Sequence, residues 1–334
     1  MTMVSLSAFA CDRLRKDVAG QLDQRETDMT GVASALGPLF LLILLGAVMG
    51  RLRQPGGDFW PQMERLIYFL LFPAMLVSTL ATADVSQVPV GRVAVALLGA
   101  MGLFGALLWG LRDWLGLPPP AFTSAFQGAL RFNTYVGVAG AAALHGTPGA
   151  TVAAVAVALM VPVVNVLCVT SFIAAGTLGA GSLGKSFAAL ARNPLILGCL
   201  VGIGLNVSGI GLPGWSEATV ELLGRAALPL GLVAVGVALR PAALLRLDRG
   251  VWATNLVKLG LMPALVLALS LALGLDPISR DVALLFAALP TATSAYILAR
   301  QLGGDAEMMA ALITAQTLLA MATLPLWLRL AGAG

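Results

Sequence analysis

Two short polar segments interrupt otherwise apolar stretches of this sequence, and their residue types are the ones best suited to chemistry. Arg131–Gly137 reads Arg-Phe-Asn-Thr-Tyr-Val-Gly, and Leu289–Tyr296 reads Leu-Pro-Thr-Ala-Thr-Ser-Ala-Tyr. Pro290 lacks an amide donor, and Gly137 with the Asn/Thr cluster makes the first segment similarly breakable. A broken helix offers free amides at one end and free carbonyls at the other, so it can bind an anion or a cation without a formal charge. The alternative is that Pro290 only kinks a helix while the hydroxyl groups bond back to their own turns.

The composition predicts the elements that must position these segments. Of the 334 residues, 59% are hydrophobic and 11% are charged, whereas an ordinary soluble domain is about half apolar and about a quarter charged. The apolar residues form charge-free runs long enough to cross a bilayer. The sequence therefore predicts an all-α membrane protein and excludes an ordinary soluble enzyme. Nucleic acid is not an expected partner, because Arg and Lys are scattered singly between the apolar runs and form no basic face.

Charged residues bound ten predicted transmembrane helices, five in each half of the chain. The apolar runs are Met29–Gly50, Leu66–Ala83, Val93–Leu111, Trp114–Leu130, Phe132–Gly184, Asn193–Ser216, Ala226–Leu239, Leu259–Asp276, Val282–Ala299 and Met308–Leu328. His145–Gly149 divides the longest run into the second half of helix 4 and the whole of helix 5. In domain terms, we expect a poorly structured or dispensable tail at 1–28, a first repeat at 29–176, a short cytoplasmic linker at 177–192 and a second repeat at 193–334.

Landmarks recur between the two halves at an offset of about 157 residues, which predicts an internal duplication. Asn133-Thr134 corresponds to Pro290-Thr291, and Pro73 corresponds to Pro229. Because each unit has an odd number of helices, the copies must be inverted in the membrane, as in many secondary transporters. Helices 4 and 9 are then the interrupted ones, and we expect them to cross near the membrane midplane.

Basic residues predict the orientation, because Arg and Lys favour the cytoplasmic side of short loops. If the first helix starts outside, ten basic residues lie in the inner loops and four in the outer ones. The sequence thus predicts a multi-pass protein of the bacterial inner membrane with both termini on the periplasmic side.

Arg131 and Lys258 are basic residues placed where a span should be apolar, and such residues are functional candidates by default. Arg131 adjoins the helix 4 break and is the better candidate, since Lys258 could instead reach the inner surface with its long side chain. No Asp or Glu lies in the central part of any predicted span. Asn165, Lys258 and Gln316 are possible ion-binding or supporting residues. Neutral oxygens could hold sodium, and those available are on Asn133, Thr134, Asn165, Thr291, Thr293, Ser294 and Gln316. Whether Na⁺ or H⁺ is coupled stays open.

The sequence contains no set of residues typical of a metal site or of an enzyme active site. Cys11, Cys168 and Cys199 are far apart, and His145 is the only histidine, so we expect no metal site and no cofactor. Gly303-Gly304-Asp305 is similar to a motif of intramembrane aspartyl proteases, but a second intramembrane Asp is absent. We expect a turn with a helix cap there, and no enzyme.

With these features the chain resembles the auxin efflux carrier family, which includes plant PIN auxin carriers and bacterial proteins often described as malate or malonate permeases. The motifs that carry the resemblance are Arg131–Tyr135, Pro162–Asn165, Arg192–Gly198, Leu228–Leu232 and above all Leu289–Asp305. The resemblance implies that helices 1, 2, 6 and 7 form a scaffold and that helices 3 to 5 and 8 to 10 form a transport domain. Helices 4 and 9 would cross at the substrate site, and an elevator movement of the transport domain would give alternating access. The first crossover lacks the proline of the plant carriers, and the loop between the halves is short, so the bacterial branch is the closer match.

The sequence thus predicts a transporter of a small organic anion, a mono- or dicarboxylate, with the lipid bilayer around it and a homodimer permitted through the scaffold helices. The predicted substrate-binding residues are Arg131, Asn133, Thr134, Tyr135, Pro290, Thr291, Thr293 and Ser294. Two alternatives stay open. One is a sodium-coupled symporter of a larger amphipathic anion, like the related bile acid symporters, and the other is a ligand-sensing membrane protein without transport.

Overall fold

The computed structural model describes residues 34–177, 193–246 and 248–332, and every regular element in these ranges is helical. The helices of the first half are Ser34–Arg51, α2 (Phe59–Leu66), η1 (Ile67–Leu71), α3 (Phe72–Thr82), η2 (Val85–Gln87), α4 (Val90–Gly110), α5 (Arg112–Leu115), α6 (Pro119–Leu130) and α7 (Thr134–Ala174). Those of the second half are α9 (Pro194–Val207), α10 (Gly214–Val237), η4 (Pro241–Arg246), α11 (Arg249–Leu256), η5 (Val257–Leu261), α12 (Met262–Ala272), α13 (Pro277–Ala288), α14 (Ser294–Leu302) and α15 (Ala306–Ala331). The predicted tail at 1–28 and most of the predicted linker lie outside the described residues.

The membrane character of the chain is plain from its helices. Within the described ranges, seven helices are long and apolar enough to cross a bilayer, and a shorter apolar helix lies at Pro194–Val207. One of the seven, Pro119–Ala174, has 56 residues, far more than one crossing needs. The protein is therefore a multi-pass membrane protein. The count of ten crossings stays a prediction, because several predicted spans correspond to short or interrupted helices.

Several helices begin earlier in the sequence than the predicted spans. Each predicted span starts after the nearest charged residue, whereas the helices include those charged residues. α2 includes Glu64 and Arg65, and α10 includes Glu217, Glu221 and Arg225. Arg225 Nη2 lies 2.6 Å from Glu221 Oε1, one helical turn away, and both side chains are largely exposed. Such pairs stabilise a helix outside the apolar layer, so charges mark where a helix leaves the membrane and not where it ends.

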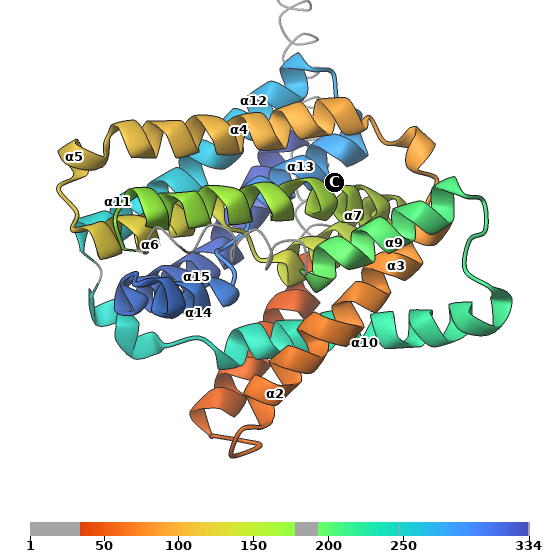
Figure 1. Ribbon diagram of the computed structural model, residues 1–334, viewed down its shortest axis with the longest axis horizontal. Helices are drawn as coiled ribbons and strands as arrows, with labels where there is room; N and C mark the ends of the chain where they lie inside the picture. The colour runs from red at the N-terminus through yellow and green to blue at the C-terminus, as the bar shows by residue number, and fades with distance from the viewer. Residues whose placement is uncertain (1–33, 178–192, 247, 333–334) are drawn as a thin grey trace, which may run out of the picture.

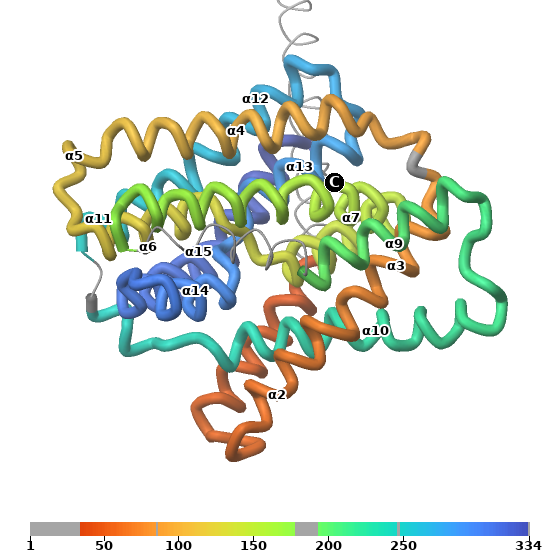
Figure 2. Tube along the Cα trace, viewed as in Figure 1, coloured from red at the N-terminus to blue at the C-terminus, as the bar shows by residue number. Residues whose placement is uncertain are grey.

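The helices pack into two groups, which Figure 1 shows in colour and Figure 2 as a trace. The first group consists of Ser34–Arg51, α2, η1, α3, α9 and α10; α3 packs extensively against α9 and α10. The second group consists of α4, α6, α7 and α11 to α15, in which α13 packs against α7, α12 and α15. We call these the α3/α10 group and the α7/α13 group. Both contain segments from each half of the chain.

Close backbone contacts hold the α3/α10 group together. A Cβ atom on Gly236 of α10 would lie 1.9 Å from the carbonyl oxygen of Ile43, and one on Gly46 would lie 2.0 Å from that of Val233. Small residues that allow such contact are a common way of packing helices in membranes, where apolar burial between helices gains little.

We expect Gly236→Val to lower the apparent melting temperature of the detergent-purified protein by several degrees or to prevent its recovery, since overpacking costs about 1–3 kcal/mol or more. The matched control is Gly204→Val on α9, because a Cβ at Gly204 meets no atom within 4 Å. Equal melting temperatures for the two variants would show that the two backbones are not in contact.

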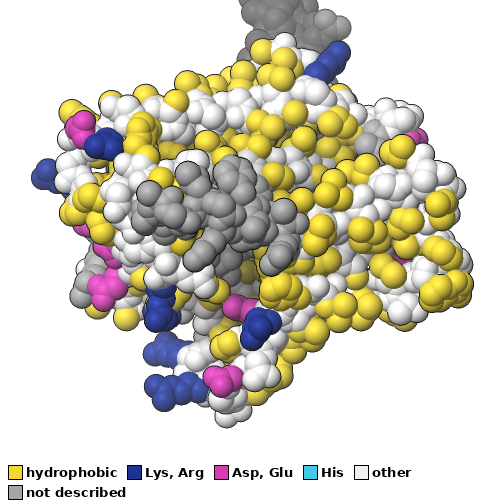
Figure 3. Space-filling view, in the orientation of Figure 1, with side chains coloured by type: hydrophobic (Ala, Val, Ile, Leu, Met, Phe, Trp, Pro, Cys, Tyr) yellow, Lys and Arg dark blue, Asp and Glu magenta, His cyan; other side chains and the backbone are white. Residues whose placement is uncertain are grey.

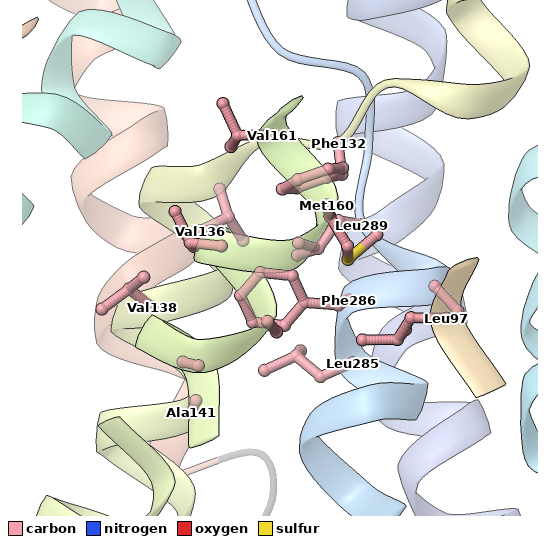
Figure 4. Close-up of a cluster of buried hydrophobic side chains, with 14 of the residues drawn as sticks. Leu97, Phe132, Val136, Val138, Ala141, Met160, Val161, Leu285, Phe286 and Leu289 are labelled. Atoms are coloured by element: carbon pink, nitrogen blue, oxygen red, sulfur yellow. The ribbon is translucent and has the colours of Figure 1, made fainter. Parts of the chain in front are cut away.

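An apolar cluster supports the α7/α13 group, and Figure 4 shows part of it. Phe286 of α13 is fully buried, and its ring centroid lies 5.7 Å from that of Phe132. A Cβ on Gly137 would lie 2.7 Å from Leu289 Cδ1 and 2.9 Å from Phe286 Cζ, so α7 can lie this close to α13 only with glycine at 137. The two predicted polar segments therefore begin and end on a rigid apolar core.

The predicted interruption at His145–Gly149 is a sharp bend within α7. Gly146 has φ 59° and ψ −141°, a conformation that glycine adopts readily and other residues do not. Beside the bend, His145 Nε2 lies 3.2 Å from Oδ2 of the buried Asp281 of α13. The only histidine of the sequence therefore pairs with a carboxylate of a neighbouring helix.

Candidate substrate site at the two helix breaks

The two polar segments are breaks in helical structure, and they lie against each other. α6 ends at Leu130 and α7 begins at Thr134, while α13 ends at Ala288 and α14 begins at Ser294. The first residue after each helix is extended, with ψ 151° at Arg131 and ψ 146° at Leu289. The backbone amide of Asn133 donates to the carbonyl oxygen of Pro290 at 2.8 Å. Two helix carboxyl ends and two helix amino ends are thereby brought to one place.

Asn133 begins α7 as its N-cap. Its Oδ1 accepts hydrogen bonds from the amides of Tyr135 at 3.1 Å and Val136 at 3.3 Å, and the residue is 1% exposed. Asparagine is among the best N-cap residues because its side-chain oxygen satisfies amides that lack an intrahelical partner. Its oxygen is used within the protein, and Nδ2 forms no hydrogen bond with a described residue. The structure thus gives Asn133 a positioning role.

Thr291 and Gln316 join the second break to α6. Thr291 Oγ1 lies 2.8 Å from the carbonyl oxygen of Gly128 and 2.7 Å from Gln316 Oε1. The Thr291 amide donates to Gln316 Oε1 at 2.9 Å, and Gln316 Nε2 donates to the Gly128 carbonyl at 3.0 Å. Both side chains are buried and their polar atoms are occupied. They hold the break in shape, and neither offers an atom to a ligand.

Arg131 supplies a positive charge directly after α6. It is 9% exposed, and its Nη2 donates to Asn165 Oδ1 at 2.5 Å. Asn165 is itself fixed, since its Nδ2 donates to the Val161 carbonyl at 2.9 Å. Arg131 Nε is buried and has no hydrogen-bond partner among the described residues. Because no carboxylate pairs with it there, this guanidinium retains the capacity to bind an anion.

The amino end of α14 differs from that of α7 in having no cap. Thr293 occupies the N-cap position and its side chain makes no capping hydrogen bond. The first amides of a helix have no intrahelical partner and carry partial positive charge. Thr293 and Thr134 are partly exposed and Ser294 is exposed, whereas Asn133 and Thr291 are buried. The amides of Ala295 and Tyr296 donate to the carbonyls of Ala292 and Thr293, so the accessible groups at the breaks are the hydroxyls of Thr134, Thr293 and Ser294.

Comparisons with known proteins agree with this geometry. A family model described as "Membrane transport protein" matches residues 180–328. Over 319 residues, the chain is 30% identical to the "Putative malonate transporter" of Rhizobium meliloti (strain 1021), and the match covers 88% of this chain and 94% of that protein. The chain belongs to the auxin efflux carrier family. It is a membrane transporter and not an enzyme.

Tyr135 lies where the two helix groups of the transporter meet. Its ring contacts Phe72 of α3 edge-to-face, with a centroid distance of 4.9 Å. A Cβ on Gly231 of α10 would lie 2.9 Å from the same ring. The predicted binding residue Tyr135 therefore joins the breaks to the α3/α10 group, and its contacts in the structure are with that group.

Lys258 of the transporter is buried, so the alternative that its side chain reaches the membrane surface is wrong. It is 1% exposed and lies in η5, a π-helical turn between α11 and α12. A π-turn replaces the hydrogen bonds of the α-helix with bonds to residues one position further along. In η5 the carbonyl oxygen of Leu259 accepts a hydrogen bond from Trp327 Nε1 at 2.7 Å.

Sequence reasoning missed Gly128. Its carbonyl oxygen accepts hydrogen bonds from both Thr291 and Gln316, and a Cβ there would lie 2.7 Å from Leu312 Cδ1. A single glycine in an apolar run has no pattern that distinguishes it from other membrane glycines, so no sequence signal could have found this contact.

Proposed function

We propose that the transporter carries a small carboxylate, with malonate as the first candidate, bound at the adjoining helix breaks. The single observation that supports this best is the buried Arg131 at the adjoining breaks, whose Nε has no hydrogen-bond partner among the described residues. The carboxylate would take the Arg131 guanidinium and the hydroxyls of Thr134, Thr293 or Ser294. Pro290, Thr291 and Asn133 shape the site, and Tyr135 closes it toward α3.

Alternating access in this proposal is an elevator movement of the α7/α13 group against the α3/α10 group. The breaks belong to the α7/α13 group. The contact with the α3/α10 group is made by the ring of Tyr135, which packs against Phe72 and Gly231. Such a surface has few directional bonds to break when it slides. The breaks would thereby face the two sides of the membrane in turn.

The inverted five-helix repeat of this proposal has support in the two broken helices. α6 and α13 both have 12 residues, begin with proline and end at an extended residue. Each is followed by a break and a further helix. Two copies of one unit, inserted in opposite directions, would place equivalent breaks against each other at mid-membrane.

The proposed location is the bacterial inner membrane, with both termini outside. Basic loop residues support this orientation. On the visible face in Figure 3, most Lys and Arg side chains lie on the left and near the bottom of the view, while its right side is largely apolar.

Thermal stability of the purified protein in malonate, malate, indole-acetate and taurocholate tests the substrate class. A ligand at about 100 times its Kd stabilises the folded state by about 2.7 kcal/mol, so we expect malonate to raise the apparent melting temperature by several degrees. Each anion is compared in sodium and in potassium, with chloride at equal ionic strength as the control.

A shift with taurocholate alone, dependent on sodium, would instead favour the symporter of larger amphipathic anions. Malonate binding without uptake of radiolabelled malonate into reconstituted vesicles would favour the ligand sensor. No shift with any carboxylate would contradict the proposed substrate class.

A further inference from the structure

Lys258 and Asn255 form a buried polar pair that the proposed anion site does not use. Lys258 is 1% exposed and Asn255 is 4% exposed. Within the described ranges, both side-chain amide atoms of Asn255 are buried without a hydrogen-bond partner, and Lys258 forms no ion pair or hydrogen bond. Residues three apart in a helix lie on one face. An unpaired ammonium is costly to bury, so this pair calls for an explanation beyond packing.

The pair lies on α11 and η5, which pack against the broken helix α6 and against α15. α11 runs alongside α6, since Val251 clusters with Ala125 and the Thr254 methyl lies 3.1 Å from where a Cβ of Gly128 would be. Lys258 follows Thr254 by about one turn, and η5 packs against α6, α13 and α15. α12 and α13 are consecutive helices packed together, so η5 lies near the carboxyl end of α13.

Helix carboxyl ends carry partial negative charge. α6 and α13 both end at the breaks, so their final carbonyls are the nearest stabilising groups for a positive charge on Lys258. Partial charges of this kind are weaker than a carboxylate. An anion bound at the breaks would add a full negative charge to these partial charges and so stabilise the ammonium form of Lys258 further.

None of the described charged side chains on the helices around Lys258 holds its ammonium group in an ion pair. Arg92 of α4 bonds to the Gly274 carbonyl, Arg131 bonds to Asn165, and Arg280 pairs with Asp281. Asp281 also contacts His145, at the start of α13 and far from its carboxyl end. The remaining charged groups on these elements lie at helix ends: Arg249 of α11, and Glu307 and Arg329 of α15.

We propose that Lys258, with Asn255 beside it, binds the proton that crosses the membrane together with the substrate anion. This rests on the proposed function. An anion at the breaks favours the ammonium form by attraction, and by linkage the proton favours anion binding to the same extent. The neutral amine takes a proton from one side through its nitrogen lone pair, and the ammonium releases it on the other side once the anion has left. A site filled by an ammonium excludes sodium.

Radiolabelled malonate uptake into vesicles with a pH gradient tests the coupling, with the membrane potential clamped at zero. A gradient of about one pH unit can sustain about tenfold accumulation for one proton per substrate, and we expect the wild-type protein to approach it. Lys258→Met retains the packing of the aliphatic stem and should let malonate equilibrate without accumulating. Lys258→Arg, which cannot release its proton, should lose accumulation as well. Wild-type accumulation by either variant would overturn the proposal.

A second measurement needs no substrate and so separates this proposal from the substrate assignment. We expect the wild-type apparent melting temperature to rise between about pH 6 and about pH 9. As the pH rises, Lys258 loses its proton, and folding no longer bears the cost of burying an unpaired ammonium. Lys258→Met should lose this rise. Equal pH dependence in the two proteins would overturn proton binding at Lys258, whereas a lost rise with no malonate uptake would overturn only the substrate.

Discussion

Replacing Arg131 with glutamine should weaken malonate binding on the order of 100-fold and reduce uptake at low malonate concentration to the background of empty vesicles. The variant removes the buried guanidinium at the breaks, and one charge-assisted interaction of this kind contributes about 1.5–3 kcal/mol. Glutamine retains a donor for Asn165, whose Oδ1 now accepts from Arg131 Nη2. The fold should therefore survive. Titration of the melting temperature with malonate gives the affinity, and vesicle uptake gives the transport rate.

The matched control for this variant is Arg300→Gln. Arg300 is exposed in the last turn of α14, so its charge lies at the other end of the same half-helix. We expect its affinity for malonate to change less than twofold, since exposed charges contribute about 0–1 kcal/mol. If Arg131→Gln bound malonate as tightly as Arg300→Gln, the guanidinium would have no part in the site.

Gln316→Leu should abolish transport and lower the apparent melting temperature by several degrees. Leucine removes the acceptor of the Thr291 amide and a donor to the Gly128 carbonyl. Leaving buried polar groups unpaired costs about 1–3 kcal/mol for each group. Since these bonds define the path of the chain between Pro290 and Ser294, we expect malonate binding to fail even in molecules that stay folded.

Gln301→Leu is the control, because Gln301 is exposed near the end of α14. It should leave both melting temperature and uptake near wild-type values. A Gln316→Leu protein that melts normally and transports malonate would show that the bonds to Thr291 and Gly128 do not shape the site.

The positions of the two helix breaks were predictable, because the residues that break a helix are local features. Pro290 cannot donate a backbone hydrogen bond, and Asn133 competes with the helix as an N-cap. Both break positions follow from these properties without knowledge of any neighbour. Composition likewise indicated a multi-pass membrane protein; it predicted ten helices, and the described residues contain seven of membrane-spanning length.

The roles within the site were less predictable, because they depend on contacts between distant segments. Thr291 reads as a free hydroxyl in the sequence, yet its partners are residues 163 and 25 positions away. Lys258 could have reached the surface in a regular helix, but the helix that contains it has a π-turn and the side chain is buried. Which way a long side chain turns is decided by the neighbouring helices.

The hydrogen bond from the Asn133 amide to the Pro290 carbonyl has a consequence for how such a protein diversifies. It joins main chain to main chain, so it survives every side-chain replacement at position 290 and every replacement except proline at position 133. If the carboxylate binds as proposed, mutations at Thr134, Thr293 and Ser294 would alter ligand preference while this link between the two halves persists. New specificities become accessible through single steps in descendants of one ancestral carrier.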